Sequence, residues 1–298
     1  MTTDRPYASP TAFRRALTDR LRATARDSRW DLAQLQRQMA YDRLLERLYF
    51  VDDGWIVKGA VALLARDIGV RASIDIDVYR AKARDIAERE LRESADRDIG
   101  DWFRFEVRRS QPSGDGSPGI RLPVVAYIGA TVWAEFHVDL VGSDIVMTGT
   151  PEEVPPLARV AIPDVEQHGY RAYPLIDHIA DKVAAMFQRY GREEQPSTRF
   201  RDLVDLVAMI GGATVDAVAQ TAALQSERQR RRITLPQRFD VPDRARWQQG
   251  YALEARQSLL PFAKTLDEAL AVVRPFIDPL LDGSAVGTWD PENNQWTK

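Results

Sequence analysis

The sequence predicts an α+β protein with two lobes, and three observations lead to this expectation. Segments that alternate apolar and polar residues are concentrated before residue 142, and beyond residue 174 apolar residues recur at helical spacing. A proline-rich connection over 148–174 separates the two regions and is typical of a domain boundary. We therefore expect a mixed sheet with flanking helices over residues 1–160 and a helical lobe over residues 161–298.

The composition excludes several classes of site. The 298 residues include no cysteine, which excludes disulfides, zinc–thiolate sites and cysteine nucleophiles, and only three histidines, which argues against a histidine-rich zinc site. There is no run of about 18 apolar residues, and the first residues lack the apolar core of a signal sequence. We therefore expect a cytoplasmic protein that makes no membrane contact. The net charge of −3 argues against a general nucleic-acid binder.

The first lobe is predicted to begin with helices and to continue with strands. Apolar spacing predicts two helices within 12–49, with their arginines on a solvated face, and then a strand at 55–57. A tight turn at 58–60 leads into a helix that ends at Gly69, and a turn is expected over 111–119. A charged helix is predicted at 83–98. The remaining strands are predicted at 73–78, 102–110, 120–128 and 131–141.

The second lobe is predicted to be helical throughout. The proline-rich connection is expected to be the boundary that precedes these helices, and the tail from Gly283 is expected to be irregular. Helices are predicted from apolar stripes and glycine or proline stops at 175–190, 200–210, 215–232, 247–260 and 266–276.

The segment Ser73–Val78 carries the strongest chemical signal. It alternates strictly, so a strand there turns Ile74 and the other apolar residues to one face and Ser73, Asp75 and Asp77 to the other. Two carboxylates on one strand face lie about 7 Å apart and repel each other unless a cation lies between them. A divalent cation with oxygen ligands is the usual solution, and Mg²⁺ is normally held by one or two carboxylates together with substrate phosphates.

The succession of strand, small glycine turn, helix and Asp-x-Asp strand resembles the polymerase-β-like nucleotidyltransferases. The longer pattern resembles the AbiEii/MenT branch, the nucleotidyltransferase toxins of bacterial toxin–antitoxin systems. It is carried by Lys58, Gly59, Arg71, Ser73, Asp75 and Asp77. The family turn is usually Gly-Gly or Gly-Ser, whereas this chain has Ala60 in second place, which loses a hydroxyl donor but keeps the backbone amides.

Two motifs in the second lobe resemble the same family, so the resemblance covers about residues 55 to 206. The first is Asp181-Lys182-Val183, in which the lysine borders an apolar stripe and either extends to water or holds a triphosphate in the cleft between the lobes. The second is Arg199-x-Arg201-Asp202-x-x-Asp205, in which Arg201 and Asp205 are spaced to pair on one helix face.

The resemblance implies metal-assisted nucleotidyl transfer. Two Mg²⁺ ions, about 3.5–4 Å apart, would be held by Asp75, Asp77 and a third carboxylate, Asp139, for which the alternative is a surface position on an edge strand. The implied catalytic residues are Asp75, Asp77, Lys182 and Asp202. The implied nucleotide-binding residues are Lys58, Gly59, Ala60, Arg71, Ser73, Lys182 and Arg201.

The resemblance further implies an NTP donor, a tRNA 3′ end as acceptor, blocked aminoacylation and translation, and a cognate antitoxin. Two alternatives stay open: nucleotidylation of a protein hydroxyl, and a catalytically inactive module that binds a nucleotide or a partner. An RNA acceptor requires a basic path to Asp75. The candidate surfaces are the N-terminal arginine face and the cluster formed by Arg228, Arg230, Arg231 and Arg232.

Ser73 is also a candidate site of regulatory phosphorylation. A phosphate there adds a charge of about −1.5 to −2, which would repel an anionic donor and compete for Mg²⁺. The alternative is a small residue that only permits close packing.

Overall fold

The computed structural model describes residues 6–112, 119–143, 145–158, 160–191 and 193–298, so the turn predicted over 111–119 lies largely outside the described residues. The chain forms two compact units. The N-terminal unit contains the residues up to Ala65 together with Ala72–Ile145 and Glu153–Ala172. The C-terminal unit contains Arg66–Arg71, Val146–Glu152 and Tyr173–Lys298. The boundary expected between residues 160 and 161 stays a prediction.

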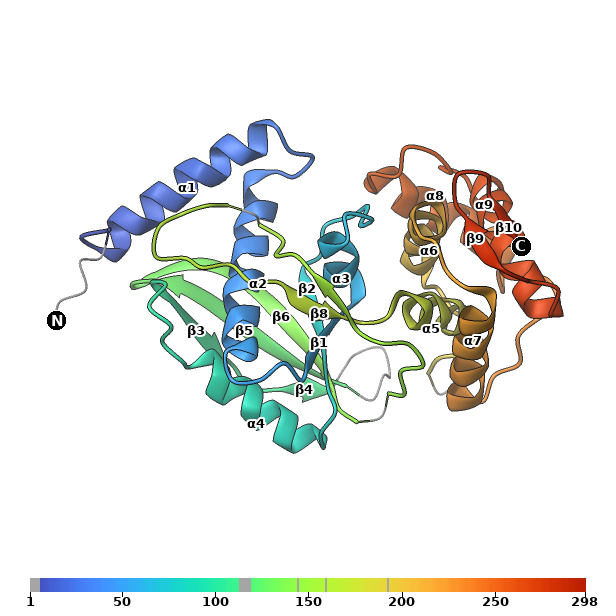
Figure 1. Cartoon of the computed structure of the whole chain (residues 1–298), viewed down its shortest axis with the longest axis horizontal. Helices are drawn as coiled ribbons and strands as arrows, with labels where there is room; N and C mark the ends of the chain where they lie inside the picture. The colour runs from blue at the N-terminus through green and yellow to red at the C-terminus, as the bar shows by residue number, and fades with distance from the viewer. Residues whose placement is uncertain (1–5, 113–118, 144, 159, 192) are drawn as a thin grey trace. The chain divides into compact units, whose positions relative to one another are not determined.

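A mixed sheet of eight strands forms the N-terminal unit (Figure 1). The strand order is β3-β5-β6-β2-β1-β8-β7, and the short β4 pairs beside β5. The pairs β1–β2 and β5–β6 are antiparallel, whereas β2–β6 and β1–β8 are parallel. The strands are β1 Trp55–Lys58, β2 Asp75–Arg80, β3 Phe103–Val107, β4 Gln111–Pro112, β5 Ile120–Ile128, β6 Thr131–Val141, β7 Glu152–Val154 and β8 Tyr170–Ala172.

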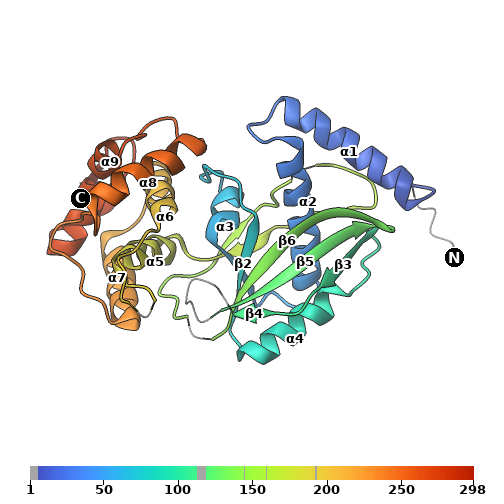
Figure 2. The ribbon, with the colours of Figure 1, turned by 180° about the vertical axis from the view of Figure 1, so that it is seen from behind.

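Helix α2 (Leu32–Tyr49) covers one face of this sheet. Asp31 and Gln34 form a capping box at its start. The Tyr41 ring meets Phe136 of β6 edge-on, with centroids 4.9 Å apart. The face of β5 and β6 that points away from α2 is turned toward the viewer in Figure 2. The other helices of this unit are α1 Pro10–Arg26, α3 Gly59–Ala65 and α4 Arg84–Ala95.

The C-terminal unit is built mainly from helices that bury apolar stripes against one another. Helix α5 packs with α6 and α7, and α9 packs with α6, α7 and α8. The helices are α5 Leu175–Phe187, α6 Phe200–Gly212, α7 Ala217–Arg231, α8 Arg244–Gln257 and α9 Leu266–Asp282. The α+β prediction, with an N-terminal mixed sheet and a C-terminal run of helices, is confirmed. Within the described residues, the helices are too short or too polar to cross a membrane.

Several local predictions were wrong. The connection over 148–174 contains β7 and β8, whose three residues each are too few to show alternation. The tail forms a hairpin of β9 (Thr288–Asp290) and β10 (Gln295–Thr297), because Trp289 is buried on the helical core. Helix α3 ends at Ala65 rather than near Gly69.

The arginines of α2 were expected on a solvated face, and for two of them this expectation was wrong. Arg43 and Arg47 are buried, and both hydrogen-bond to the carboxylate of Asp101, at 2.6 to 2.8 Å. A buried guanidinium persists only with such a partner. These two residues are therefore bound inside the N-terminal unit. They do not belong to the arginine surface that the sequence had suggested for RNA binding.

Candidate functional site

Four charged residues lie in one row across adjacent strands of the N-terminal unit. Arg121 of β5 is the register partner of Asp139 of β6. Asp139 is in turn paired with Asp77 of β2, and Asp77 is paired with Lys58 of β1. Register partners point to the same face of a sheet, with Cβ atoms about 5 Å apart. The row therefore places two carboxylates between two cations, on the face opposite α2.

Asp75 lies two residues before Asp77 on β2, and its register partner is His137 of β6. Its Oδ1 is 3.1 Å from Nδ1 of His137, and Nη2 of Arg121 approaches its Oδ2 at 3.5 Å. The predicted strand face is thus present for Asp75 and Asp77, and the fold adds Asp139 to it. Whether these three carboxylates bind metal stays a prediction.

Arg121 is the residue of this face that the sequence analysis missed. Its Nε donates to Oδ1 of Asp139 at 2.8 Å, and its Nη2 donates to Oδ2 at 2.7 Å. The hydrogen bonds to Asp139 raise the pKa of Arg121 further above its ordinary value, and the charges of Asp75 and Asp77 add to the effect. The guanidinium is therefore a permanent positive charge held in a two-point ion pair.

The position of Arg121 depends on a β-bulge. From Ile128 and Thr131 inward, a regular hairpin register would place Arg121 opposite Val138. The register shifts by one residue between Ala126 and Tyr127, which moves Arg121 opposite Asp139. The sequence signal that could have revealed this residue was an arginine in β5, the strand that pairs with β6. Hairpin spacing alone would have placed that arginine opposite Val138 rather than Asp139.

Gly59 brings the backbone of the turn against Asp77. Its φ is +59°, and a Cβ at this position would lie 1.8 Å from Oδ2 of Asp77. Only glycine combines this backbone conformation with this close approach. Ala60 is buried, so its methyl group packs inside the unit, and the proposed phosphate contacts of this turn stay predictions.

Ser73 and Ile74 lie before β2 rather than within it. The Oγ of Ser73 donates to the backbone oxygen of Asp75 at 2.7 Å, and the Ser73 backbone oxygen accepts from the Tyr41 hydroxyl at 3.0 Å. Ile74 is 61% exposed, so the expectation that it shares the apolar face was wrong. Sheet pairing starts at Asp75, and the local turn removes Ile74 from the alternation.

The donor set bears on how a divalent cation would be held. Taken over the described residues, no group of three or more His, Asp or Glu side chains is gathered so that it could hold a metal ion. On the row face, Asp139 already has both oxygens bonded to Arg121. Asp75 and Asp77 are the two carboxylates of this face that lie on one strand, and two is the number that Mg²⁺ usually takes from a protein when a substrate supplies phosphates.

A second charged cluster lies within the C-terminal unit. Lys182 of α5 is buried, and its Nζ is 2.9 Å from Oδ1 of Asp202 and 2.8 Å from Oδ2 of Asp205, both on α6. The alternative of a lysine that extends to water is therefore wrong. Arg71 donates to Asp205 through Nε at 3.0 Å and through Nη2 at 2.8 Å, and Arg199 donates to Asp202 at 2.5 Å.

Within this cluster, each charged group favours the ionised form of its oppositely charged neighbours. Burial raises the pKa of Asp205, but the nearby charges of Lys182 and Arg71 outweigh it and hold the pKa below the ordinary value. Burial lowers the pKa of Lys182, and the two carboxylates outweigh that effect and raise it. Arg201 does not pair with Asp205 as the spacing allowed, because its Nε donates to Glu254 of α8 at 2.9 Å. Its nucleotide-binding role stays a prediction.

The arginine cluster at the end of α7 is partly engaged inside the C-terminal unit. Arg231 donates to Glu227 at 2.9 Å and to Asp181 at 2.6 Å, and Arg230 donates to Glu227 at 2.6 Å. The bond to Asp181 joins α7 to α5, whereas the pairs with the buried Glu227 lie within α7. Of the predicted RNA-binding cluster, Arg228 and Arg232 are exposed.

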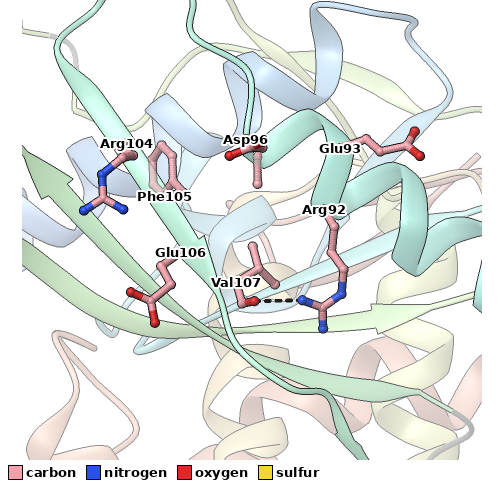
Figure 3. A pocket seen from close by; sticks show the side chains of 8 residues that line it. Arg92, Glu93, Asp96, Arg104, Phe105, Glu106 and Val107 are labelled. Carbon is pink, nitrogen blue, oxygen red and sulfur yellow. Dashed lines mark hydrogen bonds between the residues drawn. The ribbon is translucent and has the colours of Figure 1, made fainter.

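A hollow of about 500 Å³ lies elsewhere in the N-terminal unit, between α4 and the edge strand β3 (Figure 3). Arg92 reaches from α4 to the backbone oxygen of Val107, at 2.7 Å. Phe105 and the charged side chains of Arg104 and Glu106 line it. Neither Asp75 nor any residue of the charged row lines this hollow.

One family model matches most of this chain. The family model described as "Nucleotidyl transferase AbiEii toxin, Type IV TA system" matches residues 43–272. No curated protein matches the chain. Among solved structures, the nucleotidyltransferase toxin MenT4 from Mycobacterium tuberculosis H37Rv has 15% identity and a TM-score of 0.51, with 90% of this chain and 98% of MenT4 covered. JHP933 from Helicobacter pylori has 15% identity and a TM-score of 0.47, with 83% of this chain and 94% of that chain covered.

Proposed function

Because this chain belongs to the AbiEii nucleotidyl transferase toxin family of type IV toxin–antitoxin systems, we propose that it transfers nucleotides from an NTP to the 3′ end of tRNA. The modified tRNA could no longer be aminoacylated, and translation would stop. The family also implies an antitoxin that restrains this toxin. The observation that carries the proposal is the charged row of Lys58, Asp77, Asp139 and Arg121, with Asp75 beside it.

Asp75 and Asp77 are the residues that would hold Mg²⁺. When bound there, Mg²⁺ would neutralise charge on the donor phosphates and lower the pKa of the attacking hydroxyl. Lys58 adds a positive charge at the end of the row, where it can stabilise the anionic phosphates. Gly59 lets the turn approach Asp77 without a side chain in the way.

Lys182 is proposed to contribute to donor binding in its own cluster. An ammonium group has three N–H donors, and Asp202 and Asp205 accept two of them. In this proposal the third is donated to a phosphate oxygen of the NTP. Asp202 and Asp205 would then act by keeping Lys182 charged and fixed in one orientation.

A transfer assay that separates the two possible acceptors, RNA and protein, tests the proposal. The purified full chain is incubated with each α-labelled NTP, Mg²⁺ and total tRNA, and RNA and protein are resolved separately. Label on tRNA that is lost in Asp75→Asn and in Asp77→Asn is the expected result, and Asp267→Asn, at an exposed position, is the matched control. Label on protein would favour the protein-hydroxyl alternative, and no label with any NTP would favour the inactive binding module.

A further inference from the structure

Asp139 is already fully engaged by Arg121. Both of its carboxylate oxygens accept hydrogen bonds from the guanidinium, at 2.8 and 2.7 Å, and its side chain is 18% exposed. A planar guanidinium that meets a carboxylate at two points is among the stronger ion pairs in proteins. Metal binding by Asp139 would require this pair to break.

The charges on this face also favour fewer metal ions than three free carboxylates would attract. Asp75, Asp77 and Asp139 contribute three negative charges, and Lys58 and Arg121 contribute two positive ones. One negative charge remains, which a single divalent cation more than balances. Two divalent cations would leave a strong positive excess before any phosphate arrived.

Arg121 has donors left for an anion. Its bonds to Asp139 use Nε and Nη2, and Nη2 also approaches Asp75 at 3.5 Å. Its Nη1 makes no hydrogen bond to the described residues. The side chain is 38% exposed, so the outer edge of the guanidinium is accessible on the same face as Asp75 and Asp77.

We propose that Arg121 takes the place of a second divalent cation in this site. Asp75 and Asp77 hold a single ion, Asp139 positions the guanidinium, and Arg121 donates to the anionic phosphates of the substrate. This inference rests on the proposed function, because it assigns roles within the same site. It replaces the two-metal arrangement on three carboxylates that the family resemblance implies.

Counting bound Mn²⁺ tests the metal part without relying on catalysis. The full chain is titrated with Mn²⁺ alone, and free Mn²⁺ is measured by electron paramagnetic resonance. We expect one Mn²⁺ per chain. The decisive variant is Arg121→Gln/Asp139→Asn, because it removes one positive and one negative charge and leaves the net charge of the site unchanged. It should bind one Mn²⁺ with a Kd within about threefold of the wild type, whereas Asp77→Asn should bind about tenfold or more weakly.

The single variant Arg121→Gln frees Asp139 and should gain a second bound Mn²⁺. Two Mn²⁺ per wild-type chain, or a double variant as weak as Asp77→Asn, would overturn the inference and leave the proposed function standing. Unchanged Mn²⁺ binding in both Asp75→Asn and Asp77→Asn would instead remove the acidic site, and the proposed function with it. Circular dichroism establishes that each variant is folded.

Binding of inorganic triphosphate in EDTA tests the phosphate part. This probe contains the phosphates of every NTP and no base, and EDTA removes the metal contribution. The charge-neutral double variant should bind it about tenfold more weakly than the wild type, because a charged donor is lost. Equal affinity in the two proteins would contradict a phosphate-binding role for Arg121.

Discussion

Arg71 holds Asp205 through two hydrogen bonds, from Nε at 3.0 Å and from Nη2 at 2.8 Å. The two residues are far apart in the sequence, and Arg71 belongs to the short segment Arg66–Arg71 that packs in the C-terminal unit. The family motif that includes Arg71 and the one that includes Asp205 therefore meet in one ion pair. This pair predicts a structural role for Arg71, beside the nucleotide-binding role that the sequence suggested.

Arg71→Ala should lower the free energy of unfolding by about 2 kcal/mol, because buried Asp205 keeps only Lys182 as a charged partner. Urea titration at neutral pH measures the effect. Arg201→Ala is the matched control, since its pair with Glu254 is exposed and should contribute less than about 1 kcal/mol. Equal stabilities of Arg71→Ala and the wild type would contradict the structural role and leave nucleotide binding as the role predicted for Arg71.

Asp205 should make the protein lose stability in acid. Its pKa is lower in the folded state than in the unfolded chain, where an aspartate has a pKa of about 3.9. The stabilisation is therefore present above about pH 4 to 5 and is lost as the pH falls toward the folded-state value. The stability difference between wild type and Asp205→Asn should shrink between about pH 5 and 3.

Urea titrations at several pH values check this trend, with Asp267→Asn as the control. Asp267 is 73% exposed, so its removal should cost little at any pH in this range. A constant difference between wild type and Asp205→Asn across the range would show that Asp205 titrates alike in both states.

Gly59→Ala should lose both stability and transfer activity. The positive φ costs about 1–2 kcal/mol for any residue with a Cβ, and the methyl group would also displace Asp77. A displacement of about 1 Å can lower turnover about a hundredfold. Gly100→Ala is the control, because Gly100 also has a positive φ of +81° but no neighbour within 4 Å of a Cβ. Similar turnover in the two variants would mean that the approach of Gly59 to Asp77 is not required.

RNA binding should depend on Arg228 and Arg232 more than on their neighbours. If both contact phosphate, Arg228→Gln/Arg232→Gln should reduce the slope of log K against log salt by up to about 1.5–2 units. Arg230→Gln/Arg231→Gln should mainly lower stability, because these residues pair with Asp181 and Glu227. Filter binding to tRNA at several salt concentrations gives the slopes, and equal slopes in all three proteins would exclude this helix end from the RNA surface.

Ser73→Glu should silence transfer, whereas Ser73→Ala should stay active. The hydroxyl of Ser73 bonds the backbone of Asp75, so a charge at this position lies next to the carboxylate that would hold the metal. Loss of that hydrogen bond in Ser73→Ala should cost only about 1 kcal/mol of stability. A Ser73→Glu variant that labels tRNA at the wild-type rate would rule out charge-based control here.

Local sequence was sufficient for most of the longer helices and strands and for the two carboxylates of β2. Alternation in β2 placed Asp75 and Asp77 on one face, because neighbouring side chains of a strand point to opposite sides. Apolar periodicity and stop residues located the helices of the C-terminal unit for the same kind of local reason. The three-residue strands β7 and β8 were too short to leave such a signal.

Only the tertiary structure decided which charges meet. Arg121 faces Asp139 because a bulge shifts the β5–β6 register by one residue, and a shift of that size reverses the face of every side chain beyond it. Lys182, Asp205 and Arg71 meet because three segments separated along the chain pack in one unit. The sequence by itself therefore determined the fold class and the Asp-x-Asp strand, whose causes are local. Register and long-range packing determined the partners, because those depend on contacts between segments that no local pattern records.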